Sequence, residues 1–253
     1  MPVADASDRP ACWVQVALDV PLQGVFDYRA TVRVAVGMRV IVPFGRRKLV
    51  GVVVALPEQP AFDPEQVKEI DQVLDDTLPL PADWLRLASF AAQYYQRPLG
   101  EVMLPALPAG LRKVAAYQGK RSSGGPVQRI DRRKPAQAAD IQADQPPTLN
   151  AEQAAAAQAI AALHVHKTVL LHGVTGSGKT EVYLHAIQAT LARGRRVLFM
   201  VPEINLTPQL EQSLRARLAG LAGADALAVL HSGLADGERL QAWLRMQRGQ
   251  ARV

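Results

Sequence analysis

Short apolar runs near the start of the chain alternate with polar positions and are separated by glycines and prolines. Residues 13–18 alternate apolar and polar side chains, and residues 38–44 and 49–56 are rich in Val and Ile. The tetrapeptide at residues 45–48, Gly-Arg-Arg-Lys, lies between the last two runs and predicts a turn. We expect these runs to form a small antiparallel sheet or barrel of about 60 residues.

The pattern then changes to helical spacing. Trp84, Leu87 and Ala91 fall on one face of a helix predicted over residues 83–95. From residue 148, short apolar runs alternate with longer stretches of helical spacing. The apolar runs predict strands at residues 168–172, 197–201 and 226–230. The stretches between them predict one helix that follows Asn150 and ends at residue 163, and further helices at residues 181–191, 207–218 and 236–246. Strands alternating with helices indicate an α/β fold with a parallel sheet and right-handed crossovers.

The segment between these regions lacks an apolar period and is strongly basic. Residues 112–150 contain clusters of Ser, Gly and Pro, which predicts a flexible linker. Residues 111–135 hold eight basic side chains and one acidic one, although the net charge of the whole chain is only +6. Such a segment suits a solvated linker or a stretch that binds phosphates. We therefore divide the chain into residues 1–110, 111–147 and 148–253.

The composition narrows the class of protein. Apolar residues make up 49 % of the chain, which is enough for a packed core. The single cysteine, Cys12, allows neither a disulfide framework nor a cysteine-based zinc site, so no zinc is expected here. No apolar run is long enough to cross a membrane, and residues 1–10 lack the apolar centre of a signal peptide. We expect a cytoplasmic location and no membrane partner.

A phosphate-binding loop is the strongest chemical signal. The pattern G-x-x-x-x-G-K-[ST], between an apolar run and a helix, is formed by Gly173, Val174, Thr175, Gly176, Ser177, Gly178, Lys179 and Thr180. The glycines let backbone N–H groups turn toward an anion, and the N-terminus of the helix adds a positive dipole end. We expect Lys179 to reach the β- and γ-phosphates of ATP and Thr180 to offer its hydroxyl to Mg²⁺. The spacing excludes a dinucleotide-binding G-x-G-x-x-G loop.

Further motifs surround this loop. The sequence reads GVTGSGKTEVY at 173–183, VPEINLTPQ at 201–209, LHSGL at 230–234, ERLQAW at 238–243, FDY at 26–28 and VPFG at 42–45. Together these resemble motifs I and Ia, the stretch that follows them, and the N-terminal DNA-binding domain of the primosomal protein N-prime (PriA) family. That family comprises superfamily 2 helicases of bacterial replication restart.

The resemblance implies an ATP-driven 3′-to-5′ DNA helicase that acts at stalled or repaired forks. It implies a small β-rich N-terminal DNA-binding domain followed by a partial RecA-like lobe. Single-stranded and forked DNA, primosome proteins and single-strand-binding proteins would be its partners, in a bacterial, nucleoid-associated setting.

The resemblance also implies a pocket for a DNA 3′ end, lined by Phe26, Asp27 and Gly45, with Lys68 as the matching basic residue. A terminal base stacks on an aromatic ring, and a carboxylate accepts a hydrogen bond from a 3′-OH. On the residues alone, a core position for Phe26 and a turn position for Asp27 are favoured, and the resemblance reverses this preference.

Other candidates have a competing structural role. Gln153 lies where the related helicases use a glutamine to contact adenine, but it also sits at the third position of a helix capped by Asn150, where it would complete a capping box. The resemblance suggests that Glu203, Thr207 and Gln209 face DNA, whereas Thr207 and Gln209 also suit a helix start and a solvated face. For His231, with Ser232, we expect no catalytic role.

The chain departs from the family pattern in two ways. About 40 residues of linker composition stand where the family has a winged-helix domain, and the basic residues 112–134 are expected to supply phosphate contacts instead. No Asp-Glu pair follows an apolar run, so no Walker B motif is found. We expect a truncated product or fragment, because residues 249–253 cut through an α/β unit, with negligible ATP hydrolysis on its own.

Two rival functions are weighed against a restart helicase. One is a module that binds DNA forks without motor activity. The other is a P-loop kinase or transporter ATPase unrelated to DNA, which leaves residues 201–209 and the N-terminal motifs unexplained.

Overall fold

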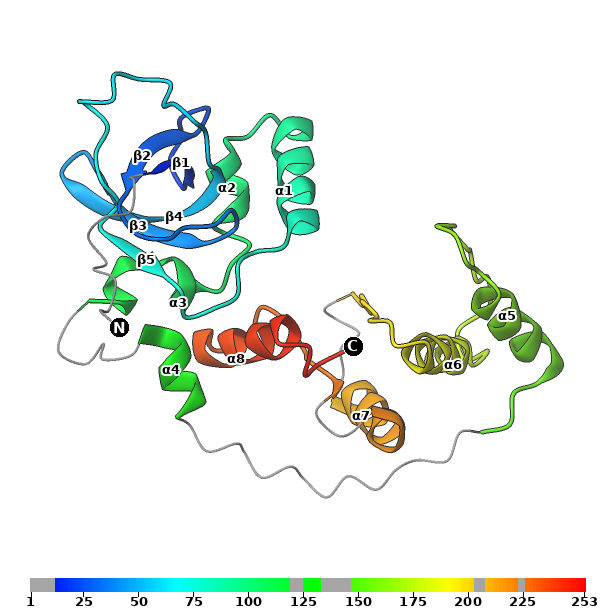
Figure 1. Cartoon of the computed structure of the whole chain (residues 1–253). Coiled ribbons are helices and arrows are strands. Elements are labelled where there is room, and N and C mark those ends of the chain that lie inside the picture. The colour runs from blue at the N-terminus through cyan, green and yellow to red at the C-terminus, as the bar shows by residue number, and fades with distance from the viewer. Residues whose placement is uncertain (1–11, 119–124, 133–146, 203–207, 223–225) are drawn as a thin grey trace, which may run out of the picture. The chain divides into compact units, whose positions relative to one another are not determined.

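The computed structural model describes residues 12–118, 125–132, 147–202, 208–222 and 226–253 (Figure 1). The chain divides into two compact units, each described here by itself. The first comprises residues 1–133 with 236–240, and the second comprises residues 134–235 with 241–253.

The first unit is built on a five-stranded antiparallel sheet. Its strands are β1 (Cys12–Leu18), β2 (Phe26–Ala30), β3 (Arg39–Phe44), β4 (Arg47–Ala55) and β5 (Gln72–Leu74), in the order β2-β1-β4-β3-β5. Every neighbouring pair is antiparallel, and the sheet curls on itself in Figure 1. The prediction of a small antiparallel sheet is therefore confirmed, while β2 and β5 were not predicted.

The core of this unit follows the alternation seen in the sequence. Val14, Val16 and Leu18 of β1 are buried and pack with valines from β3 and β4. The β3–β4 hairpin closes through two residues, Gly45 and Arg46, between the paired Phe44 and Arg47. Gly45 has a φ of +58°, which the first position of such a tight turn requires and glycine adopts without steric cost.

The described part of the first unit also contains the helices α1 (Ala82–Tyr94), α2 (Leu99–Met103), α3 (Ala109–Arg112) and α4 (Gly125–Asp131) and the 3₁₀ turn η1 (Val114–Ala116). Helix α2 packs on β1 so closely that a Cβ at Gly100 would lie 1.8 Å from the Leu18 carbonyl oxygen. Helix α4 lies inside the segment predicted to be a flexible linker, and its Val127 is buried. For residues 125–131 that prediction is wrong, because one buried valine and one buried proline are too few to produce a visible apolar period.

A buried arginine ties the segment after α3 to the sheet. Arg39 of β3 is only 2 % exposed and donates through Nη1 to the Leu111 carbonyl oxygen at 2.8 Å and to the Tyr117 hydroxyl. Its Nη2 binds the Asp76 carboxylate and the Thr77 hydroxyl. A buried guanidinium is stable only when its donors are paired in this way, so the network fixes residues 111–117 against β3.

The second unit contains the helices α5 (Ala151–Ala161), α6 (Lys179–Ala192), α7 (Pro208–Ala222) and α8 (Asp236–Gln247), whose first turn is grouped with the first unit. Its core is formed by buried side chains of α6 and α7 together with the ends of extended segments, namely Leu184, Ile187, Leu191, Leu214, Leu218, Leu227 and Val253. Helix α5 begins with the capping box predicted from the sequence.

The predicted parallel sheet is not present in the described part of this unit. Residues 168–172, 197–201 and 226–230, where strands were predicted, form no strand of a sheet. The last two residues connect the later segments by main-chain hydrogen bonds: Val197 N donates to Arg252 O, Arg252 N and Val253 N to Ala226 O, and Ala228 N to Val253 O. Because a β-strand needs consecutive hydrogen-bonded pairs along its length, these few bonds are not enough to form strands of a sheet.

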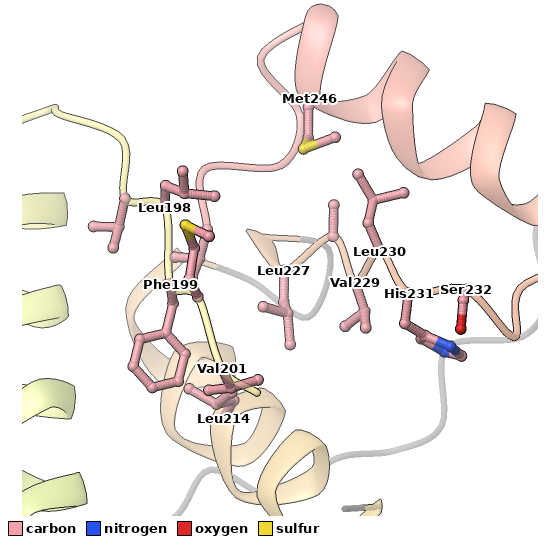
Figure 2. A pocket seen from close by; sticks show the side chains of 14 residues that line it. Leu198, Phe199, Val201, Leu214, Leu227, Val229, Leu230, His231, Ser232 and Met246 are labelled. Carbon is pink, nitrogen blue, oxygen red and sulfur yellow. The ribbon is translucent and has the colours of Figure 1, made fainter. Parts of the chain in front are cut away.

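A hollow of about 420 Å³ lies beside Val253, which is one of its lining residues (Figure 2). Residues 197–201 line one side and residues 227–232 the other, with Leu214 and Met246 completing the wall. Leu198 and Met200 are 84 % and 81 % exposed, which is unusual for residues of their size.

Candidate functional site

The phosphate loop bends directly into helix α6. Gly176 and Gly178 have φ angles of +82° and +77°, in the left-handed region that favours glycine. Gly178 is the N-cap of α6, and no side chain caps it, so the first amide groups of the helix stay available to an anion. The loop residues before Gly178 are exposed, as a nucleotide would require.

The ammonium group of Lys179 lies over the loop. Its Nζ donates to the carbonyl oxygens of Gly173 and Val174, both at 2.7 Å. Lys179 is thus directed toward the concave side of its own loop, where a phosphate would meet a positive charge and helix amides together.

Gln153 connects the loop to α5 rather than standing free beside it. Its Oε1 accepts from the backbone N–H of Asn150 at 3.0 Å, and its Nε2 donates to the Ser177 carbonyl oxygen at 3.0 Å. Both ends of the amide are engaged, so a contact with adenine would have to replace one of these bonds.

Thr180 is exposed in the first turn of α6, at a position that suits an oxygen ligand of a nucleotide-bound Mg²⁺. In the described part of the chain, no group of three or more His, Cys, Asp or Glu side chains could hold a metal ion.

A second hollow lies in the first unit and gathers the four residues predicted for a DNA end. A cavity of about 300 Å³ is lined by Phe26 and Asp27 of β2, Gly45 of the hairpin, and Lys68, together with Tyr28, Pro43, Phe44, Phe62, Gln66 and Val67. Lys68 reaches this place because its carbonyl oxygen accepts from Arg29 N and Ile70 N donates to Arg29 O, which pairs its segment with β2.

The chemistry of this pocket combines a ring edge and an unsatisfied acceptor. Phe26 and Phe44 pack edge to face, with ring centroids 5.2 Å apart. Asp27 Oδ2 accepts from the backbone N–H of Ala61 at 2.7 Å, while its Oδ1 is buried without a hydrogen-bond partner among the described residues. A buried carboxylate oxygen without a donor is costly, and a ligand hydroxyl would supply that donor.

Burial also shifts the pKa of the tyrosine in this region. Tyr28 donates its hydroxyl to the Pro43 carbonyl oxygen at 3.1 Å, and desolvation raises its pKa to about 12. The hydroxyl therefore remains protonated at neutral pH and fixes β2 against β3 behind the cavity.

The remaining residues predicted to contact DNA are not among the described residues that line the cavity around Asp27 or form the phosphate loop. Glu203 and Thr207 fall outside the described residues, as does the side chain of Gln209. His231 lines the hollow of Figure 2, where its Nδ1 accepts from Gly233 N at 3.2 Å.

Sequence reasoning missed Phe44 and Phe62 as lining residues and Arg217 as the partner of Glu181. Phe44 stands inside the VPFG motif and could have been found there, whereas Phe62 and Arg217 carry no local signal.

Two family models match the chain. Residues 15–108 match the 3′DNA-binding domain (3′BD) of PriA, and residues 153–249 match the DEAD/DEAH box helicase family.

Several curated proteins with the same name are similar to this chain, including two that match most of its length. Replication restart protein PriA of Treponema pallidum is 36 % identical over 245 residues, covering 94 % of this chain and 34 % of that protein. The Haemophilus influenzae protein of that name is 33 % identical over 305 residues, covering 95 % of this chain and 41 % of the relative. The Bacillus subtilis protein is 46 % identical over 88 residues. The chain thus spans about two fifths or less of the length of these relatives.

None of the helices in the described ranges has the length and apolar character needed to cross a membrane.

Proposed function

Because this chain belongs to the PriA family of replication restart proteins, with its 3′DNA-binding domain and part of its DEAD/DEAH box helicase region, we propose that it binds DNA 3′ ends and ATP. The 3′ end would enter the cavity around Asp27, and the triphosphate would bind residues 173–180.

The unsatisfied Oδ1 of Asp27 is the observation that carries the DNA proposal. A terminal 3′-OH donates a hydrogen bond that an internal nucleotide cannot, because the internal 3′ oxygen is esterified. Phe26 offers a ring for the last base, and Lys68 offers a positive charge to its phosphate. Gly45 has no neighbour within 4 Å of the position where a Cβ would stand, so a backbone passes there without obstruction.

The test compares single-stranded DNA that ends in a 3′-OH with the same strand ending in a 3′-phosphate, by fluorescence anisotropy. We expect the 3′-OH strand to bind roughly tenfold more tightly, the size of a hydrogen bond to a charged group. Asp27→Asn keeps the side-chain shape but presents an NH₂ group in the cavity, and should abolish the difference. Asp83→Asn, in an exposed pair with Arg86, is the matched control. Equal binding of both strands by the unaltered protein would contradict the proposal.

The nucleotide proposal rests on the loop geometry around Lys179 and Gly178. Binding of Mg-ATP by isothermal titration calorimetry, and its loss in Lys179→Ala, are the expected results. ATP-driven 3′-to-5′ unwinding at stalled forks, with primosome and single-strand-binding proteins as partners in the bacterial cytoplasm, is proposed for the whole protein of this family.

A fork-binding module without motor activity is the second candidate, since the exposed Arg129 of α4 and Arg132 just after it belong to the same compact unit as the cavity around Asp27. Arg129 donates to Ala116 O and Arg132 to the side chain of Gln128, both at exposed positions. Neutralising Arg129, Arg132, Arg133 and Lys134 should weaken DNA binding and flatten its salt dependence, by about 0.7–0.9 in the log–log slope per lost phosphate contact. An unchanged slope would show that this segment does not contact DNA. ATP hydrolysis that is stimulated by DNA would favour the helicase over the module without motor activity.

A further inference from the structure

Helix α6 carries an acidic residue in the turn that would receive the triphosphate. Glu181 follows Thr180 directly and is the third residue of the helix, with its N–H donating to Gly178 O at 3.0 Å. The helix N-terminus, Lys179 and the loop amides are arranged for an anion, so a carboxylate in the same turn opposes the ligand unless it is neutralised or turned away.

Helix α5 demonstrates the capping geometry that a residue at this position can adopt. There Gln153, also third in its helix, reaches back over the first turn and accepts from the N-cap amide of Asn150 at 3.0 Å. A glutamate is an equally good residue for this capping box. In α6 the same movement would bring the Glu181 carboxylate over the amides that phosphates are proposed to bind.

Arg217 holds Glu181 in another direction. This α7 residue is 4 % exposed, and its guanidinium binds the carboxylate with both ends: Nη1 to Oε2 at 2.9 Å and Nη2 to Oε1 at 3.3 Å. Two-point binding fixes the orientation of the carboxylate as well as compensating its charge. The pair also joins α6 to α7, whose Leu214 and Leu218 pack in one core with Ile187.

We propose that Arg217 is a positioning residue for the nucleotide site: by binding Glu181, it keeps the carboxylate from capping α6 and repelling the triphosphate. The inference rests on the proposed ATP binding at residues 173–180. Arg217 itself need not touch the nucleotide, since it acts through the direction and charge of Glu181.

The test measures Mg-ATP, Mg-ADP and AMP binding to the 253-residue chain by calorimetry. Arg217→Met releases Glu181, and we expect ATP to bind roughly tenfold more weakly, ADP to be affected less and AMP least, because the repulsion grows with phosphate charge. The double variant Glu181→Ala/Arg217→Met removes both the released carboxylate and the uncompensated arginine, and should bind ATP nearly as the unaltered chain does. Thermal unfolding of each variant checks the fold.

Controls separate this role from packing. Arg215→Met breaks the Arg215–Glu211 pair on the same helix and should leave ATP affinity unchanged. Arg217→Lys keeps the charge but loses the two-point contact and should give an intermediate loss, which keeps the test open if Arg217→Met does not fold. A double variant as weak as Arg217→Met, or an equal loss for all three nucleotides, would overturn the proposal. Absence of ATP binding by the unaltered chain would instead overturn the proposed function on which it rests.

Discussion

The side-chain amide of Gln153 donates to the carbonyl oxygen of Ser177 at 3.0 Å and so joins the start of α5 to the phosphate loop. Because the oxygen of the same amide completes the capping box, Gln153 is fixed in place and holds the loop even when no nucleotide is bound. Gln153→Ala should weaken ATP and GTP binding alike, by roughly twofold to tenfold, the effect of one neutral hydrogen bond. Calorimetry with both nucleotides checks this, and a loss confined to ATP would indicate that Gln153 reads adenine instead.

Gly178 and Gly194 share a left-handed backbone but differ in the space around them. A Cβ at Gly178 would stand 2.3 Å from Gln153 Nε2, whereas a Cβ at Gly194 meets nothing within 4 Å. Both alanine variants should lose about 1–2 kcal/mol of stability from backbone strain. Only Gly178→Ala should also reduce nucleotide affinity, because the Gln153 amide must move, and equal affinities in the two variants would contradict this.

Arg39 should be the most sensitive charged position of the first unit. Arg39→Ala leaves the Asp76 carboxylate and the Leu111 carbonyl without their donor, which typically costs about 3–5 kcal/mol for a buried pair. Arg86→Ala removes an exposed pair with Asp83 and should change stability by less than about 1 kcal/mol. Urea unfolding followed by circular dichroism measures both, and similar midpoints would show that the Arg39 network contributes little.

The first unit should lose stability in alkali. Burial raises the pKa of Tyr28 and of Tyr117 from 10 to about 12, so the folded form holds these protons more tightly than the unfolded form does. Their contribution is complete below pH 10 and is lost as the pH rises through 12. Urea midpoints across this range should fall, and Tyr28→Phe/Tyr117→Phe should fall less steeply. Tyr95→Phe, at an exposed ring, is the control; a pH-independent midpoint would contradict the prediction.

The sequence predicted correctly those features whose structure depends on residues close together along the chain. Asn150 and Gln153 form their capping box because both partners lie within four residues. The hairpin turn at Gly45 is likewise fixed locally. Strand β2 alternates Phe26, Tyr28 and Ala30 with polar residues, as a half-buried strand does, but it spans only five residues and was not predicted. Strand β5 has three residues, too few to show a period.

Features that depend on distant partners could not be read in this way. Residues 197–201 have the composition of a buried strand, yet a strand requires a paired neighbour, and here the pairing is limited to a few bonds. The cavity around Asp27 draws its lining from β2, the β3–β4 turn and residues 62–68, so only the family resemblance pointed to it. The contact between Glu181 and Arg217 spans 36 positions and has no periodic signature.

The hollow beside Val253 has a practical consequence for handling the protein. Leu198 and Met200 expose large apolar side chains to water, next to main-chain groups that make few hydrogen bonds to neighbouring segments. This combination favours aggregation between chains. This part of the second unit is therefore where we expect copies of the chain to associate at high concentration.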